Sequence, residues 1–70
     1  MKAFYVTFGQ IHVHAWSGRT LDRNTVGVIH AHNYEGAMEQ ARECFGEEFA
    51  NVYDKLPNMR FYPGGLVKLT

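Results

Sequence analysis

The sequence predicts an α+β domain in which one main helix packs on a mostly antiparallel sheet of four to six short strands. Three observations predict this fold: segments in which apolar and polar residues alternate, one segment with apolar residues at helical spacing, and turn residues between them. The 70 residues make one small domain, spanning 1–70, and a hydrophobic content of 46% is typical of a folded chain.

The first three strands are expected at residues 3–8, 11–16 and 25–32, where apolar and polar side chains alternate. Alternation puts one side of a strand against a core and the other toward solvent. Gly9 permits a turn or a bulge between the first two strands. Residues 17–24 are polar and are expected to form a loop before the third strand.

A helix is predicted over residues 34–45, because their apolar residues recur at the i, i+3, i+4, i+7 spacing of one helical face. Asn33 suits the N-cap, and Glu35 in the first turn suits the helix dipole. Gly46 suits a left-handed C-cap. The apolar positions are Tyr34, Ala37, Met38, Ala41, Cys44 and Phe45.

The chain after the helix is less regular. A strand is expected at residues 48–53, and the Pro-Asn pair at 57–58 ends the regular pattern. Residues 59–62 are expected to extend again, the Pro-Gly-Gly at 63–65 turns the chain, and 66–69 form a closing strand.

Side-chain parity divides the predicted sheet into two faces. The core face, which meets the helix, is expected to bring together Phe4, Val6, Phe8, Ile11, Val13, Ile29, Met38, Ala41 and Phe45. The opposite face is expected to carry Tyr5, Thr7, His12, His14, Trp16, Val28, His30 and His32. No helix remains in the sequence to cover this second face.

All four histidines lie in two His-x-His pairs, His12 with His14 and His30 with His32. Residues two apart on a strand point the same way, so the imidazoles would gather in one patch if the two strands were neighbours. Such a patch suits metal binding, proton transfer and phosphate binding. The pairs could supply about three or four nitrogen ligands to zinc or another transition metal, but no carboxylate or cysteine is placed to complete the usual sets. A solvated histidine face is the alternative interpretation.

Composition and charge argue against several classes of function. Seven acidic and seven basic residues give zero net charge at pH 7, so no nucleic-acid polymer is expected as a partner. The single cysteine, Cys44, permits no intrachain disulfide, which fits a reducing compartment. No segment has the pattern of a signal peptide or a membrane span. We therefore expect a cytoplasmic protein with no membrane partner.

A pattern of aromatic, glycine and histidine residues extends through most of the chain. It comprises Phe4-Tyr5-Val6-Thr7-Phe8-Gly9-Gln10-x-His12-x-His14, Gly18-x-Thr20-x-Asp22, Val26-x-Val28-Ile29, Ala41-Arg42, Phe45-Gly46-x-x-Phe49, Tyr53 and Met59-x-x-Tyr62-Pro63-x-Gly65. With this pattern the chain resembles a family of small uncharacterised proteins of tailed bacteriophages, from which His30 and His32 depart. The resemblance implies a phage accessory protein in the host cytoplasm. Such proteins often counter host immunity, by blocking a protein or by sequestering a nucleotide signal.

No group of residues has the arrangement of an active site, so we expect no catalysis and no cofactor. Asp22, Asp54 and the Glu47-Glu48 pair lie in no recognisable motif. The Pro-Gly-Gly turn at 63–65 lacks the lysine and the following helix of a phosphate-binding loop.

The second sheet face favours binding instead, because aromatic rings suit nucleobases and imidazoles suit phosphates. Arg19 and Arg23, in the loop after Trp16, could close on phosphates, with a solvated loop as the alternative. The candidate ligand-binding residues are Tyr5, His12, His14, Trp16, Arg19, Arg23 and His30.

These residues predict a non-enzymatic protein that binds a small phosphate-bearing ligand, and the phage resemblance implies that the ligand is a nucleotide immune signal that is sequestered. Two alternatives stay open: a protein-binding inhibitor of a host enzyme or defence protein, and a histidine-rich metal-binding protein. The small core and the aromatic face also predict a homo-oligomer, a dimer joined through or beside the face that bears Trp16.

Overall fold

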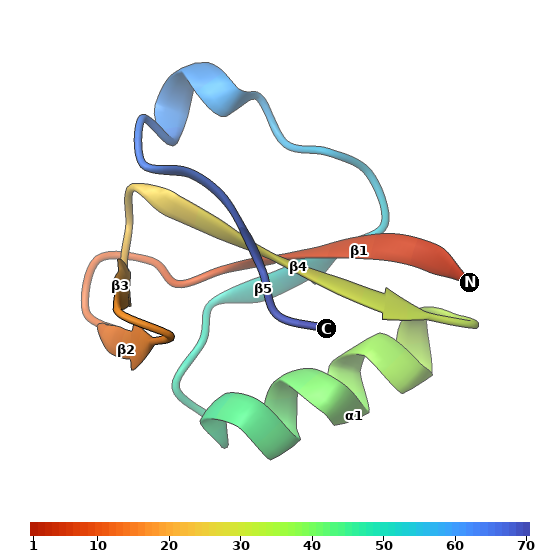
Figure 1. The fold of residues 1–70 in the computed structure, drawn as a ribbon. Helices are drawn as coiled ribbons and strands as arrows, with labels where there is room; N and C mark the ends of the chain where they lie inside the picture. The colour runs from red at the N-terminus through yellow and green to blue at the C-terminus, as the bar shows by residue number, and fades with distance from the viewer.

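The computed structural model describes residues 1–70 and consists of a four-stranded sheet, one helix and a small hairpin (Figure 1). The strand order of the sheet is β5-β1-β4-β6, and only the β4–β6 pair is parallel. Strands β2 and β3 form a separate two-stranded sheet. The predicted α+β class, with one helix on a mostly antiparallel sheet, is confirmed. Along the chain the elements are β1 (Lys2–Thr7), β2 (His14–Trp16), β3 (Arg19–Leu21), β4 (Thr25–Ala31), α1 (Tyr34–Phe45), β5 (Asn51–Tyr53), the 3-10 helix η1 (Met59–Phe61) and β6 (Gly65–Lys68).

The strand order explains why both faces of the sheet receive a cover. Helix α1 connects β4 with β5 and lies on one face. Residues 54–64, which contain η1, connect β5 at one edge with β6 at the opposite edge, so they must cross the sheet. They cross it on the face away from α1 (Figure 1). On that face, Val26 is 0% and Thr7 is 4% exposed, so the prediction of an uncovered second face is wrong for the part beneath this segment.

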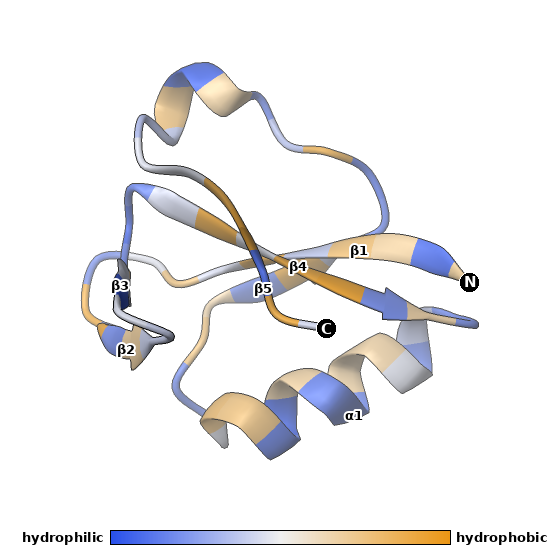
Figure 2. Cartoon of the chain, viewed as in Figure 1, coloured by the Kyte–Doolittle hydropathy of each residue, from blue (hydrophilic) through white to orange (hydrophobic).

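The core lies between α1 and the sheet. Phe4 of β1 is paired with Ile29 of β4, and because paired residues share a face, both side chains point toward the helix. Figure 2 shows hydrophobic stretches along β1 and β4 and polar residues in the loops. The buried cluster contains Phe4, Val6, Phe8, Leu21, Ile29, Ala31, Ala37, Ala41, Phe45, Val52 and Val67, with Met38 packed against it.

Helix α1 begins and ends where its sequence predicts. The Asn33 side chain accepts a hydrogen bond of 2.8 Å from the backbone N–H of Gly36. At the other end, Gly46 has a φ of 64°, and its N–H donates to the carbonyl of Arg42 at 2.8 Å. The helix has 12 residues, and neither it nor η1 has the length and the apolar composition that a membrane-spanning helix needs.

The strand predicted at residues 11–16 is only partly formed. The chain turns at Gly9, which has a φ of 65°, and leaves the main sheet. Only the last residues of the segment form β2, and they pair with β3. Ile11 and Val13 are 84% and 65% exposed, so their predicted place in the core is wrong. The alternating pattern is present, but the side that carries His14 and Trp16 packs on α1, and the side that carries Ile11 and Val13 faces solvent.

The loop predicted at residues 17–24 contains β3, so β2 and β3 form a hairpin. Ser17 and Gly18 at its tip both have positive φ angles, 49° and 79°. Two consecutive residues with positive φ are typical of a two-residue type I′ turn, whose twist matches that of the flanking strands.

The C-terminal third matches the predictions in its strands and departs from them between the strands. The strand predicted at 48–53 is shorter, and the one predicted at 66–69 is β6. Residues 59–62 do not extend, because most of them form η1. The Asn58 side chain caps this turn by accepting a hydrogen bond of 3.1 Å from the N–H of Arg60.

Candidate ligand-binding groove

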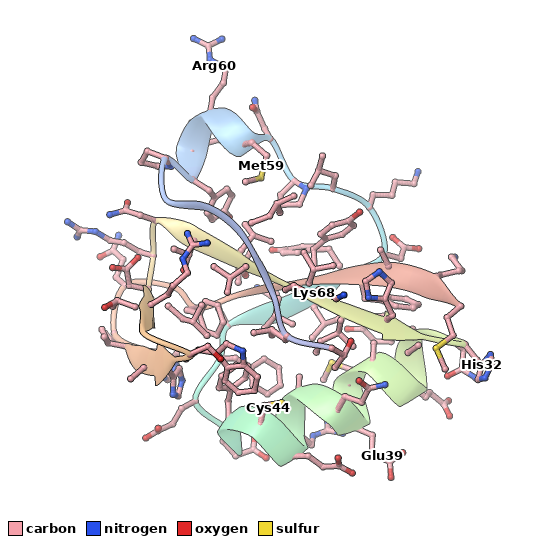
Figure 3. The ribbon with its side chains drawn as sticks, viewed as in Figure 1. His32, Glu39, Cys44, Met59, Arg60 and Lys68 are labelled. Carbon is pink, nitrogen blue, oxygen red and sulfur yellow. The ribbon has the colours of Figure 1, made fainter.

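The histidine pairs lie on separate parts of the molecule. His12 and His14 lie before and in β2, whereas His30 and His32 lie at the end of β4. Strand β2 pairs only with β3, so the two strands that carry the histidine pairs are not neighbours. The four imidazoles therefore do not gather in one patch. In Figure 3, His32 lies on the opposite side of the molecule from the hairpin. No group of three or more histidine, cysteine, aspartate or glutamate side chains is placed to hold a metal ion.

His14 and Trp16 belong to the helix side of the molecule. The His14 ring lies 4.6 Å from the ring of Phe45, measured between centroids, and its Nε2 donates to the Glu48 carbonyl at 2.6 Å. The Trp16 ring lies 5.8 Å from the same phenylalanine. Both residues therefore extend the core at the end of α1, and their predicted place on the face away from the helix is wrong. The hairpin that carries them folds toward α1 instead of joining the sheet.

Tyr5 and His30 do lie on the second face, as predicted. Tyr5 is half-buried and is paired with Tyr53 of β5. Nδ1 of His30 donates to the Thr70 carbonyl at 3.3 Å, and the backbone N–H of His30 donates to Oγ1 of Thr70 at 2.8 Å. The His30 imidazole is thus engaged by the end of the chain.

The two arginines of the predicted site have different surroundings. Nη2 of Arg19 donates to the Gly64 carbonyl at 3.1 Å, so Arg19 ties β3 to the end of the 54–64 segment. Arg23 makes no hydrogen bond within the protein and lines a groove on the second face. Of the seven candidate residues, Arg23 alone reaches this groove.

The groove lies where four segments meet: the turn after β1, the turn before β4, the start of β5 and the end of η1. Its volume is about 410 Å³, which is within the range of small-molecule sites, roughly 300–1,000 Å³. It is lined by Thr7, Gly9, Gln10, Arg23, Asn24, Ala50, Asn51, Tyr53, Phe61 and Tyr62.

The wall formed by η1 is anchored to the sheet. The N–H of Gly64 donates to the Asn24 carbonyl at 2.7 Å. A Cβ at position 64 would lie 2.7 Å from that carbonyl oxygen and 2.7 Å from Cγ2 of Thr25, so only glycine fits the contact. In Figure 3, Met59 lies between η1 and the sheet, whereas Arg60 points away into solvent. The anchored turn therefore holds Phe61 at the groove.

The lining combines one cation, aromatic rings and free amides. Phe61 is 72% exposed and Tyr53 is 42% exposed, so their rings are accessible. The amide side chains in the groove make no hydrogen bond within the protein; they are Gln10, Asn24 and Asn51. No carboxylate, imidazole or thiol lines the groove. Such a surface can bind an anion and an aromatic ring together.

Most of the lining residues are not among the residues that the sequence predicts for the site. Tyr53, Phe61 and Tyr62 are aromatic residues at or near a turn-rich segment, which was the available signal. These residues line one groove with Arg23 because residues 54–64 cross the sheet. No local sequence pattern predicts that crossing.

Comparisons of the chain with protein-family models, with curated proteins and with solved structures find no match. The chemistry of the groove is therefore the main structural basis on which a function can be proposed.

Proposed function

We propose that the chain binds and sequesters a small phosphate-bearing ligand, a nucleotide signal of the infected cell, as an accessory protein of a tailed bacteriophage. The observation that carries the proposal is the unpaired guanidinium of Arg23 in one groove with accessible aromatic rings. The resemblance to small phage proteins supplies the biological context.

Each part of a nucleotide has a partner in the groove. The planar guanidinium of Arg23 matches two phosphate oxygens. The rings of Phe61 and Tyr53 can stack on a base, and such stacking is worth about 1–3 kcal/mol per base. The free amides both donate and accept hydrogen bonds, as the edges of bases require.

The lining supports binding without chemical change. General acid–base catalysis near neutral pH needs a group that exchanges protons there, most often an imidazole or a carboxylate. The groove has neither, and it has no thiol that could act as a nucleophile. The ligand should therefore be released intact.

Calorimetry against a panel of nucleotides tests the proposal. We expect at least one nucleotide to bind, and we expect Arg23→Gln and Phe61→Ala each to weaken its binding by roughly tenfold or more, as the loss of a charge-assisted hydrogen bond or a stacked base implies. Arg60→Gln is the matched control, because Arg60 precedes Phe61 and points away from the groove (Figure 3). The proposal fails if no nucleotide binds more tightly than about 1 mM. Recovery of an altered nucleotide would contradict the absence of catalysis.

One observation favours the alternative, a protein-binding inhibitor. Ile11 and Val13 are large apolar residues exposed on the connection between β1 and β2, outside the groove. The test replaces both residues, Ile11→Ser and Val13→Ser, in one variant. If this variant loses its activity against host immunity in cells but still binds the nucleotide, the protein acts by inhibiting a host protein and not by sequestering a nucleotide. A second copy of the chain is another occupant for these residues, and light scattering at about 100 µM would show the predicted dimer if its affinity is micromolar or tighter.

A further inference from the structure

We infer that the groove selects nucleotides whose phosphate carries a single negative charge, the chemical class of cyclic mononucleotides. This inference rests on the proposed function and narrows its ligand class. It follows from the charges in and beside the groove.

The groove offers one positive charge and no other. Arg23 is the only charged residue in the lining. A phosphate monoester carries about −1.5 to −2 charges at pH 7, whereas a phosphodiester carries one. One guanidinium thus neutralises a diester, and each further charge of a monoester or polyphosphate would lack a partner.

One carboxylate lies at the edge of the groove, beside Asn24. A carboxylate oxygen of Asp22 accepts a hydrogen bond of 2.8 Å from the N–H of Asn24, a lining residue, so this acid lies at the edge of the site. Like charges repel, so this carboxylate disfavours a further phosphate placed beside Asn24.

The lining also lacks what a metal-bound polyphosphate uses. Magnesium ions in nucleotide sites are held by carboxylates together with the phosphates, and no carboxylate lines this groove. The segments that carry Arg23 and Phe61 adjoin each other. Asn24, the residue after Arg23, accepts a hydrogen bond from Gly64, which ends the segment that contains η1. A compact ligand, with its phosphate folded back near its base, fits such a site better than an extended chain of phosphates.

Calorimetry with one adenosine series tests the inference; adenine is chosen because an asparagine or glutamine amide can pair with its N6 and N7. The probes are the 3′,5′-cyclic monophosphate, the 5′-monophosphate, the diphosphate and the triphosphate, each with EDTA and with magnesium. We expect the cyclic monophosphate to bind at least about tenfold more tightly than the triphosphate, a difference that calorimetry resolves readily. We expect magnesium to have no effect on the cyclic compound.

Two charge variants supply the control. Asn51→Asp puts a carboxylate into the groove at an exposed position and should abolish binding of the cyclic monophosphate. Ser17→Asp adds the same charge at the tip of the β2–β3 hairpin, outside the groove, and should leave binding unchanged. Equal effects of the two variants would refute a local role of charge.

The outcomes separate the inference from the proposed function. If the triphosphate binds most tightly, or if binding requires magnesium, the inference is wrong and the groove still binds nucleotides. If no member of the series or of the wider nucleotide panel binds, the proposed function itself fails. Tightest binding of the cyclic monophosphate, lost in Asn51→Asp and kept in Ser17→Asp, supports both.

Discussion

The two faces of the four-stranded sheet use aromatic residues for opposite purposes. On the face that meets α1, the rings of Phe8, His14 and Trp16 pack around Phe45. On the other face, the ring of Phe61 is held at the surface by a short, anchored turn. The difference comes from the cover: a regular helix presents a continuous apolar stripe to the sheet, whereas the irregular 54–64 segment leaves polar groups and rings open to solvent.

The largest expected effect concerns the aromatic cluster on the helix face. Phe45→Ala removes a buried ring that contacts three others, so we expect the free energy of unfolding to fall by about 3–5 kcal/mol. Phe61→Ala removes an exposed ring and should change it by no more than about 0.5 kcal/mol. Urea unfolding followed by fluorescence measures both. Equal losses of unfolding free energy in the two variants would show that the rings on both faces stabilise the fold to the same extent.

The next effect concerns the anchor of the groove wall. Gly64→Ala forces a methyl group against the Asn24 carbonyl and the Thr25 side chain, so we expect a loss of about 1–3 kcal/mol and weaker ligand binding. Gly18→Ala is the comparison: no atom lies within 4 Å of its Cβ, and its cost is the strained backbone alone, about 1–2 kcal/mol. Ligand affinity should fall only for Gly64→Ala. Unchanged affinity in that variant would mean that η1 does not shape the site.

A smaller effect separates the two histidines of the first pair. His14→Ala removes the hydrogen bond to Glu48 and the contact with Phe45, so we expect a loss of about 1–2 kcal/mol. The His12 side chain makes no hydrogen bond within the protein, so His12→Ala should cost less than about 0.5 kcal/mol. Neither change should alter ligand affinity. If a folded His12→Ala variant no longer bound the ligand, His12 would belong to the binding site.

The smallest effect concerns Cys44 on the helix. Burial, and then the neighbouring Glu43 carboxylate, raise the pKa of the Cys44 thiol above its ordinary value. As the pH rises past the ordinary value, the thiolate forms first in the unfolded chain, so the free energy of unfolding should fall until the pH passes the raised value. Urea unfolding of the protein and of Cys44→Ala between pH 8 and 10 should show a steeper loss in the protein with the cysteine. Parallel pH profiles would contradict this.

The accuracy of the sequence predictions follows from how local each signal is. Helix α1 was predicted to the residue, because its caps and its apolar stripe lie within the segment itself. The segment around Ile11 and Val13 was misplaced, because alternation shows that a strand has two sides but not which sheet it joins.

The candidate site was less predictable than the fold for the same reason. Arg23 was among the predicted residues, since it is a cation in a loop. Phe61 was not, because its position depends on the parallel pairing of β6 with β4 across the sheet. That pairing joins residues far apart in the sequence, and it determines where the connecting segment must pass.

Whether the groove is the binding site can be tested directly by a nuclear magnetic resonance titration of the isotope-labelled protein with a nucleotide that binds it. If the groove is the site, the largest shifts of the backbone amides should fall at its lining, including Arg23, Asn51 and Phe61. The amides of His14 and Trp16 should stay unchanged. Shifts centred on His14 and Trp16, with the groove unaffected, would show that the ligand binds at the hairpin and not in the groove.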